Sequence, residues 1–185
     1  VIAVQLLADA LRNGLTAAHV TGGKAFTTGL RASFKGADKL FQWNMGMRTA
    51  PYQGLDLLVV DEAHRVRATS DNRWTKAAER GKKAQIKELL DAAKIVVLLL
   101  DENQFVRPDE IGCTDEFVRA VGDLKIPLRK YDLSTQFRCG GCTEYVNWVD
   151  RMLGFAAPDA TDWGDRYSFE LVDSPEQLDQ MMSRC

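Results

Sequence analysis

Two adjacent carboxylates, Asp61 and Glu62, are the side chains of this sequence best suited to catalysis. They directly follow a short apolar run that consists of Leu55, Leu57, Leu58, Val59 and Val60. A short run without alternation is typical of a strand buried on both faces of a parallel sheet, and ligands bind at the carboxyl ends of such strands. One carboxylate there can hold Mg²⁺, and the other can orient or deprotonate a water that attacks a phosphate. The alternative interpretation is that both acids are simply solvated.

Two other predicted strands also end in polar side chains. Residues 101–104 follow the apolar run 95–100, and residues 136–138 follow a predicted strand at 128–133. Gln104 lies in the first cluster, and a glutamine there can hydrogen-bond a γ-phosphate oxygen or the attacking water. Arg138 lies in the second, and a guanidinium can neutralise the charge on a transferring phosphoryl group. This arrangement predicts an α/β fold with a nucleotide site at one edge of the sheet.

The string Asp61-Glu62-Ala63-His64 resembles the Walker B motif, or motif II, of helicase-type NTPases. Other segments look like motif Ia (residues 20–26), motif III with its extension (100–104 and 107–112) and motif IV (133–138). This ordered set resembles the first motor domain of superfamily 1 helicases. It resembles the Schlafen group 3-like DNA/RNA helicase domain family more closely, from residue 1 to about residue 153 and more weakly to the end.

The resemblance implies a RecA-like P-loop NTPase fold, with a mainly parallel sheet and flanking helices, that uses ATP and Mg²⁺. It implies that Asp61 is the metal residue, assisted by Glu62, and that Glu62 is the catalytic base. Gln104 would sense the γ-phosphate, and Arg138 would contact it. The alternatives are a strand cap for Gln104 and a structural ion pair for Arg138.

The resemblance also implies contact with DNA or RNA. It places Lys24 towards the nucleic acid strand, although a simply solvated lysine is the alternative, and it gives His64 the role of linking the ATP site to motif III. Independently, residues 65–83 form a basic stretch that includes Arg73 and Trp74. Such a stretch can track a phosphate backbone and stack on a base. A solvated, mobile loop is the competing interpretation.

One part of the family pattern is missing, because the sequence contains no G-x-x-x-x-G-K-[ST] phosphate loop. The family places that loop just before a helix that looks like residues 1–12, so we expect it to lie upstream of Val1. The motifs of a second motor domain are also absent. The chain is therefore expected to bind ATP poorly and to hydrolyse none by itself.

Cys139 and Cys142 form a single C-x-x-C pair, which is compatible with a redox site or half of a zinc site. Zinc needs about four ligands, and the spacing of the other cysteines and histidines does not supply them. The pattern favours the start of a helix over residues 142–153.

Hydrophobic periodicity and turn residues predict the remaining elements. Helices are expected at residues 1–12, 25–31, 83–93, about 115–121 and from 174, and strands at 17–20, 128–133 and 167–172. Residues 36–54 are expected to form a loop that packs or grips something. We expect a motor domain over residues 1–153, and a connection with the start of a second lobe over 154–185.

The composition is ordinary for a globular protein, with 45% hydrophobic and 27% charged residues and a net charge of -2. No global basic field points to nucleic acid, so such contact requires a local patch. The sequence shows no membrane span and no signal peptide, and its four cysteines do not resemble a secreted disulfide framework. These features predict a cytoplasmic protein.

Three functions remain open at this point. The first is part of an ATP-dependent helicase or translocase-like NTPase that remodels DNA or RNA. The second is a catalytically silent nucleic-acid-binding or protein-binding module of the same fold. The third is an NTPase switch that acts on protein partners.

Overall fold

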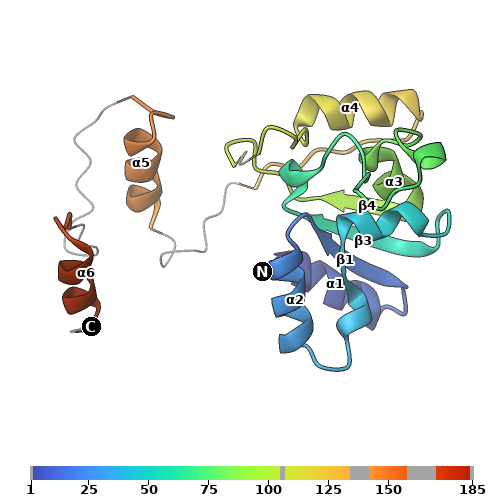
Figure 1. The fold of residues 1–185 in the computed structure, drawn as a ribbon. Coiled ribbons are helices and arrows are strands. Elements are labelled where there is room, and N and C mark those ends of the chain that lie inside the picture. Colours follow the sequence, from blue (N-terminus) through green and yellow to red (C-terminus); the bar gives the residue numbers. More distant parts are fainter. Residues whose placement is uncertain (1, 105–106, 134–141, 158–169, 184–185) are drawn as a thin grey trace. The chain divides into compact units, whose positions relative to one another are not determined.

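The computed structural model describes residues 2–104, 107–133, 142–157 and 170–183. The chain divides into two compact units, Val1–Arg129 and Lys130–Cys185 (Figure 1). The first unit contains the sheet and the segments that resemble motifs Ia, II and III, and the described residues of the second contain two helices. The segment that resembles motif IV, including Arg138, falls almost wholly outside the described residues.

The first unit is built on a parallel sheet of four strands in the order β2-β1-β3-β4. The strands are β1 (Ala17–Thr21), β2 (Phe41–Trp43), β3 (Leu55–Asp61) and β4 (Ala93–Leu98). In the paired register, Thr21 lies beside Asp61 and Val60 lies beside Leu98. Because all strands are parallel, their carboxyl ends meet at one edge. The predicted RecA-like α/β fold, with a mainly parallel sheet and flanking helices, is confirmed.

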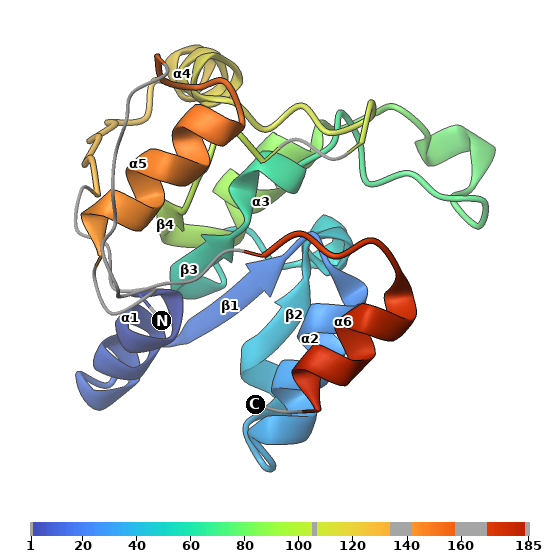
Figure 2. The same cartoon turned by 90° about the vertical axis from the view of Figure 1, so that its left-hand side faces the viewer.

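Helices cover both faces of this sheet (Figure 2). On one face, α1 (Ile2–Arg12) and α2 (Lys24–Ser33) form a core with Leu57 of β3. On the other face, α3 (Gln85–Ala92) and α4 (Thr114–Asp123) pack over Leu58 and Val60. Successive strand residues point to opposite faces, and Leu58, Val59 and Val60 are all buried, so the apolar end of β3 is buried on both sides, as predicted.

The segment at residues 36–54 is more structured than the expected loop. It contains β2 and two 3-10 helices, η1 (Asp38–Leu40) and η2 (Asn44–Thr49). Phe41 and Met47 are buried in the two cores, which agrees with the prediction that this segment packs. The sequence does not reveal β2, because three residues are too short to show a period and pairing with β1 decides their conformation.

Four element predictions differ from the structure. Residues 128–133 form no strand and are exposed, because the part of the chain that the structure describes offers them no strand partner. The strand at 95–100 is placed two residues earlier, as β4, and the helix expected from residue 83 begins at Gln85. Residues 170–172 of the last predicted strand are irregular, and 167–169 lie outside the described residues.

The second unit contains α5 (Thr143–Met152) and α6 (Pro175–Met182). The sequence predicts both helices. Ser174 caps α6 by accepting a hydrogen bond from the backbone N–H of Gln177, and Pro175 occupies the first turn. In α5, the rings of Tyr145 and Trp148 stack with their centroids 6.2 Å apart.

No described helix is long and apolar enough to cross a membrane. The predicted domain boundary after residue 153 stays a prediction.

Asp56, near the start of β3, connects this strand to the residue before β1 and to the start of β4. Its Oδ2 accepts hydrogen bonds from the backbone N–H of Thr16, at 2.9 Å, and from the Thr16 hydroxyl, at 2.7 Å. Its Oδ1 lies 2.8 Å from Nζ of Lys94 on β4. The hydrogen bond from Lys94, helped by those from Thr16, holds the pKa of Asp56 well below its ordinary value of 3.8.

We predict that Asp56→Asn lowers the melting temperature at neutral pH. A carboxyl group whose pKa is lowered by folding stabilises the protein above its unfolded pKa and loses that effect as pH falls towards the folded pKa. The difference from the unchanged protein should therefore be constant above about pH 5 and shrink below the ordinary carboxyl value of 3.8. Thermal unfolding at several pH values measures it. Asp9→Asn, which removes an exposed ion pair on α1, is the control and should change little.

Candidate functional site

Asp61 lies at the carboxyl end of β3, where a buried histidine holds its side chain. Nε2 of His19, on the neighbouring strand β1, is 3.3 Å from Asp61 Oδ2, and the backbone N–H of Glu62 donates to Oδ1 at 3.1 Å. The His19 side chain is only 1% exposed, while that of Asp61 is 26% exposed. The hydrogen bond from His19 lowers the pKa of Asp61, so this carboxyl group is ionised at neutral pH.

Glu62 is held in a similar way by the second histidine of the chain. Its Oε2 lies 3.1 Å from Nε2 of His64, whose side chain is 3% exposed, while the Glu62 side chain is 39% exposed. The backbone of Glu62 is left-handed, with φ 55° and ψ 48°, which is uncommon for a residue that is not glycine. Such strain is typical of functional sites, and here it turns the chain from β3 into η3 (Ala63–Arg65).

The segment that resembles the motif III extension packs directly on η3. A side chain at Gly112 would place its Cβ inside the contact radius of the Ala63 carbonyl oxygen and 2.8 Å from the Cα of His64, so only glycine fits. The Ile111 backbone N–H donates to the Val66 carbonyl at 2.7 Å. Next to it, the buried Glu110 lies 3.3 Å from Nε of Arg65. The turn that carries His64 is therefore fixed to this segment.

Gln104 follows β4 at the same edge of the sheet. Its side-chain amide donates to Asp101 Oδ2 at 2.7 Å, and the backbone N–H of Asn103 donates to Asp101 Oδ1 at 3.0 Å. Asp101 therefore shapes the turn that presents Gln104, which is exposed. The structure places Gln104 in contact with Asp101, and the roles predicted for Gln104 and Arg138 stay predictions.

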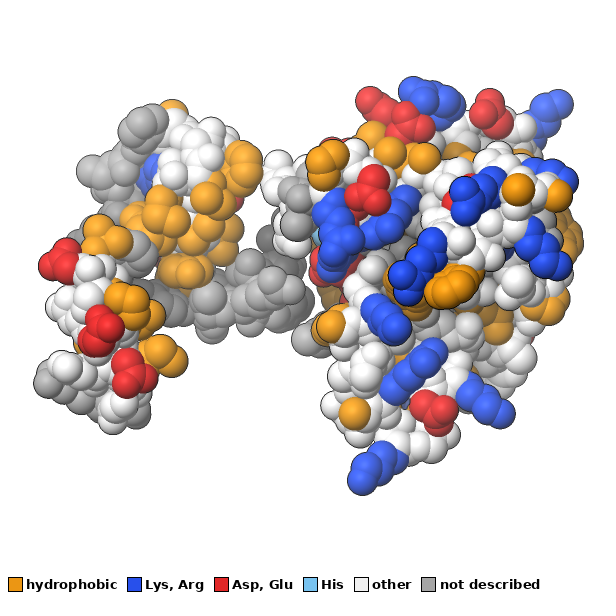
Figure 3. Space-filling view, in the orientation of Figure 1, with side chains coloured by type: hydrophobic (Ala, Val, Ile, Leu, Met, Phe, Trp, Pro, Cys, Tyr) orange, Lys and Arg blue, Asp and Glu red, His pale blue; other side chains and the backbone are white. Residues whose placement is uncertain are grey.

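The segment that resembles motif Ia lies beside the same turn. A Cβ at Gly22 would come within 2.7 Å of the Cβ of Arg65, and one at Gly23 would lie 3.3 Å from Arg65 Nη1. Lys24 follows at the start of α2 and borders a hollow of about 240 Å³ between α2 and β2, which Arg31 and Trp43 also line. Figure 3 shows that Lys and Arg side chains predominate over Asp and Glu on the visible face of the first unit.

Arg73 and Trp74 lie on the long connection between η3 and α3, away from the two acids in sequence. The Trp74 residue is 79% exposed, and the guanidinium carbon of Arg73 lies 4.8 Å from the centre of its ring. The connection is held at its base by Asp71, which lies 2.6 Å from Nη1 of Arg48. The base of the connection therefore has fixed contacts, and the nucleic-acid role of Arg73 and Trp74 stays a prediction.

The two acids suit Mg²⁺ bound together with a nucleotide rather than a metal cage made by protein alone. No group of three or more His, Cys, Asp or Glu side chains that could hold a metal occurs among the described residues. Mg²⁺ needs only one or two carboxylates, because phosphate oxygens and waters complete its ligands. Of the C-x-x-C pair, Cys142 precedes α5, as predicted, with Sγ 3.2 Å from Glu144, and Cys139 lies outside the described residues.

Sequence reasoning missed three residues that shape this site: His19, Glu110 and Gly112. His19 stands between apolar residues of the strand Ala17–Thr21, and this position could have indicated its role, because a buried imidazole needs a polar partner. Nothing in the local sequence indicates the roles of Glu110 and Gly112, since both depend on contacts with residues more than forty positions away.

A family model described as Schlafen group 3, DNA/RNA helicase domain matches residues 1–185. No curated protein and no solved structure matches the chain significantly.

We predict that Gly112→Ala destabilises the protein by about 1–3 kcal/mol, because the new methyl group would overlap the backbone of Ala63 and His64. Urea unfolding measures the loss. Gly122→Ala is the matched control: it lies in α4, where a methyl group would have nothing within 4 Å, and it should stabilise the helix by about 0.5 kcal/mol. Equal stability of Gly112→Ala and the unchanged protein would show that the two segments are not tightly packed.

Proposed function

Because the chain belongs to the Schlafen group 3, DNA/RNA helicase domain family, we propose that it is the first motor domain of an ATP-dependent helicase-like NTPase. The observation that carries this proposal is the pair of acids after β3, each held by its own buried histidine. The protein does little covalent chemistry in phosphoryl transfer. Catalysis therefore depends mainly on holding the reacting groups in the correct orientation before the reaction.

The two acids would divide the work. Asp61 is ionised and partly exposed, so it would hold Mg²⁺, with Glu62 contributing to the same site. The metal ion, when bound with the nucleotide, supplies positive charge next to the phosphate oxygens. Glu62 is more exposed, and it would orient the attacking water and accept its proton. His64 keeps the Glu62 carboxylate directed through its 3.1 Å contact.

Gln104 and Arg138 would complete the ATP site. Gln104 stands on a turn shaped by Asp101, from which its amide can exchange its bond to Asp101 for one to a γ-phosphate oxygen. Arg138 would neutralise charge on the same phosphoryl group. Because Gly112 packs against the His64 turn and Glu110 pairs with Arg65, a movement of residues 107–112 would reach Glu62.

Nucleic acid would lie along the face next to the ATP site. Lys24 borders the hollow beside α2, and Arg65 lies between the segments that resemble motifs Ia and III. These cations are local, which fits a chain of net charge -2 that binds a polyanion through one surface only.

A second candidate is a nucleic-acid-binding module without turnover. It would be favoured if the native protein had no phosphate loop of the form G-x-x-x-x-G-K-[ST] upstream of Val1, because Asp61 and Glu62 would then have no nucleotide to act on. The two candidates differ in what a protein that includes such a loop upstream would do with ATP.

We predict that the 185-residue chain alone releases no phosphate from ATP above background, because it lacks the backbone cradle and lysine that hold the phosphates. Phosphate release with and without an oligonucleotide measures this. Turnover by the chain alone that disappears in Glu62→Gln would contradict the expectation and would mean that another segment holds the phosphates.

In a longer protein that includes an upstream phosphate loop, we predict that Glu62→Gln lowers kcat for ATP hydrolysis by about 10²–10⁴-fold and leaves ATP binding nearly unchanged. The amide keeps the shape of the side chain but cannot accept the proton. Glu116→Gln, a partly exposed acid on α4, is the control and should not change kcat. A longer protein without ATPase activity would favour the silent binding module.

A further inference from the structure

The connection between η3 and α3 concentrates positive charge in a chain that is acidic overall. Residues 66–84 contain only two acids, Asp71 and Glu79, against six basic residues, namely Arg67, Arg73, Lys76, Arg80, Lys82 and Lys83. The net charge of the whole chain is -2. A surface with this local excess attracts a polyanion.

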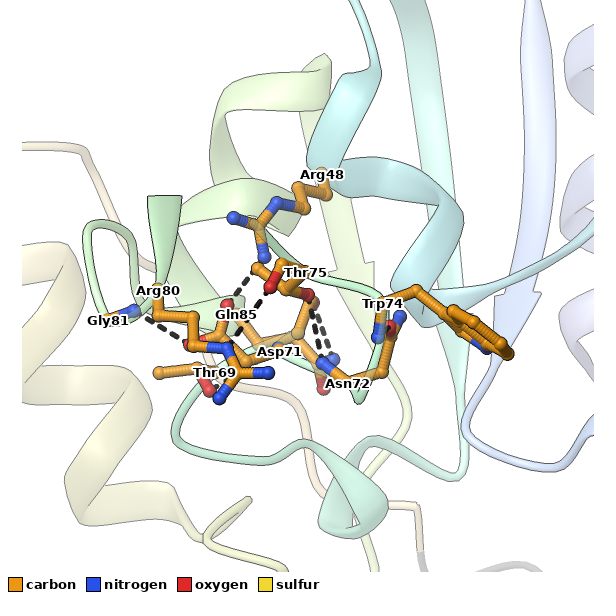
Figure 4. Close-up of polar contacts among 10 residues, drawn as sticks. Arg48, Thr69, Asp71, Asn72, Trp74, Thr75, Arg80, Gly81 and Gln85 are labelled. Atoms are coloured by element: carbon orange, nitrogen blue, oxygen red, sulfur yellow. Dashed lines mark hydrogen bonds and ion pairs between the residues drawn. The ribbon is translucent and has the colours of Figure 1, made fainter. Parts of the chain in front are cut away.

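The base of this connection is fixed to the folded domain by Asp71 and Gln85. Asp71 Oδ1 lies 2.6 Å from Nη1 of Arg48 on η2, and Oδ2 accepts a hydrogen bond from the Gly81 backbone N–H at 2.7 Å (Figure 4). Gln85 donates to the Ser70 hydroxyl at 2.8 Å and accepts from the Arg67 backbone N–H at 2.9 Å. Asp71 thus joins both arms of the connection to each other and to the domain.

The tip is ordered by its own hydrogen bonds. The Asn72 side chain accepts from the Trp74 backbone N–H at 2.8 Å, and the Thr75 hydroxyl accepts from the Asn72 backbone N–H at 2.9 Å. Arg80 Nε donates to the Thr75 carbonyl at 3.1 Å. The backbone of Trp74 is therefore held before any ligand arrives, which reduces the entropy lost on binding.

The Trp74 ring points away from these contacts, as Figure 4 shows. The residue is 79% exposed, and the Arg73 guanidinium lies against its ring with 4.8 Å to the ring centre. The ring thus offers a flat aromatic surface beside a cation. A tryptophan at the centre of a protein interface has few charged neighbours, whereas this one stands in a basic segment.

We propose that residues 72–76 form a stacking platform on which an unpaired base of single-stranded DNA or RNA lies against Trp74, while the surrounding cations contact its phosphates. Only an unpaired strand combines a phosphate backbone with free base faces, since the bases of a duplex are already stacked on one another. Stacking tolerates every base, so the platform selects single strands and reads no sequence. The inference rests on the proposed function, because it assigns a strand contact to a helicase-like domain.

The test measures binding of the 185-residue chain to a labelled oligothymidylate of about 20 nucleotides, by fluorescence anisotropy without ATP. Trp74→Ala should weaken binding by about fivefold or more, whereas Trp74→Phe, which keeps an aromatic ring, should bind nearly as tightly as the unchanged chain. The dependence on salt should be the same for Trp74→Ala and the unchanged chain, because no phosphate contact is removed, whereas Lys76→Ala should reduce it. Tyr52→Ala, another aromatic residue that is 74% exposed, is the matched control and should bind normally.

An abasic oligonucleotide of the same length separates stacking from charge. The unchanged chain should bind the abasic strand only as weakly as Trp74→Ala binds oligothymidylate. Trp74→Ala should not lower the affinity for the abasic strand any further. Oligouridylate distinguishes RNA from DNA as the preferred strand. The proposal is overturned if Trp74→Ala binds oligothymidylate like the unchanged chain, if the abasic strand binds equally well, or if the unchanged chain binds neither strand. The binding assay contains no ATP, so a failure of the platform is distinguishable from a failure of the ATP site, which is tested by kcat of Glu62→Gln in the longer protein.

Discussion

The two contacts between histidine and carboxylate at the end of β3 are the constraint on which the candidate site depends. The parallel register sets His19 of β1 beside Val59, from where its ring reaches Asp61, and the left-handed turn at Glu62 returns the chain so that His64 reaches Glu62. Nδ1 of each histidine is buried and has no hydrogen-bond partner among the residues described. Unsatisfied buried polar atoms are costly, so the fold keeps both imidazoles buried at a price in stability.

Arg65 connects this pair to the rest of the edge. Its side chain lies against Gly22 and Gly23, before α2, and its guanidinium meets the buried carboxylate of Glu110 at 3.3 Å. Arg65, which belongs to the turn after the two acids, therefore contacts both the segment nearest Lys24 and the segment that follows Gln104. Packed backbone has few ways to deform, so a displacement in one of these three segments must be accommodated by the other two.

The basic connection after η3 illustrates how one acidic residue can give order to a cationic segment. Six basic side chains repel one another and would favour an extended loop, but Asp71 holds the two ends of the connection together through Arg48 and Gly81. The hydrogen bond from Arg48, helped by that from Gly81, lowers the pKa of Asp71, so it keeps its charge throughout the neutral range. The connection thus has both a defined shape and a positive charge. A loop without such an anchor would have the charge but no defined shape.

By itself, the sequence determined the α/β class, the central buried strand, the helix capped by Ser174 and the position of Asp61 and Glu62, because these depend on local periodicity and capping. The order of the motif-like segments also identified the family. Only the tertiary structure decided that His19 holds Asp61, that Gly112 must be a glycine and that β2 exists, since each depends on partners distant in sequence. For the same reason, residues 128–133 have the composition of a strand and form none: a strand requires a neighbour with which to pair.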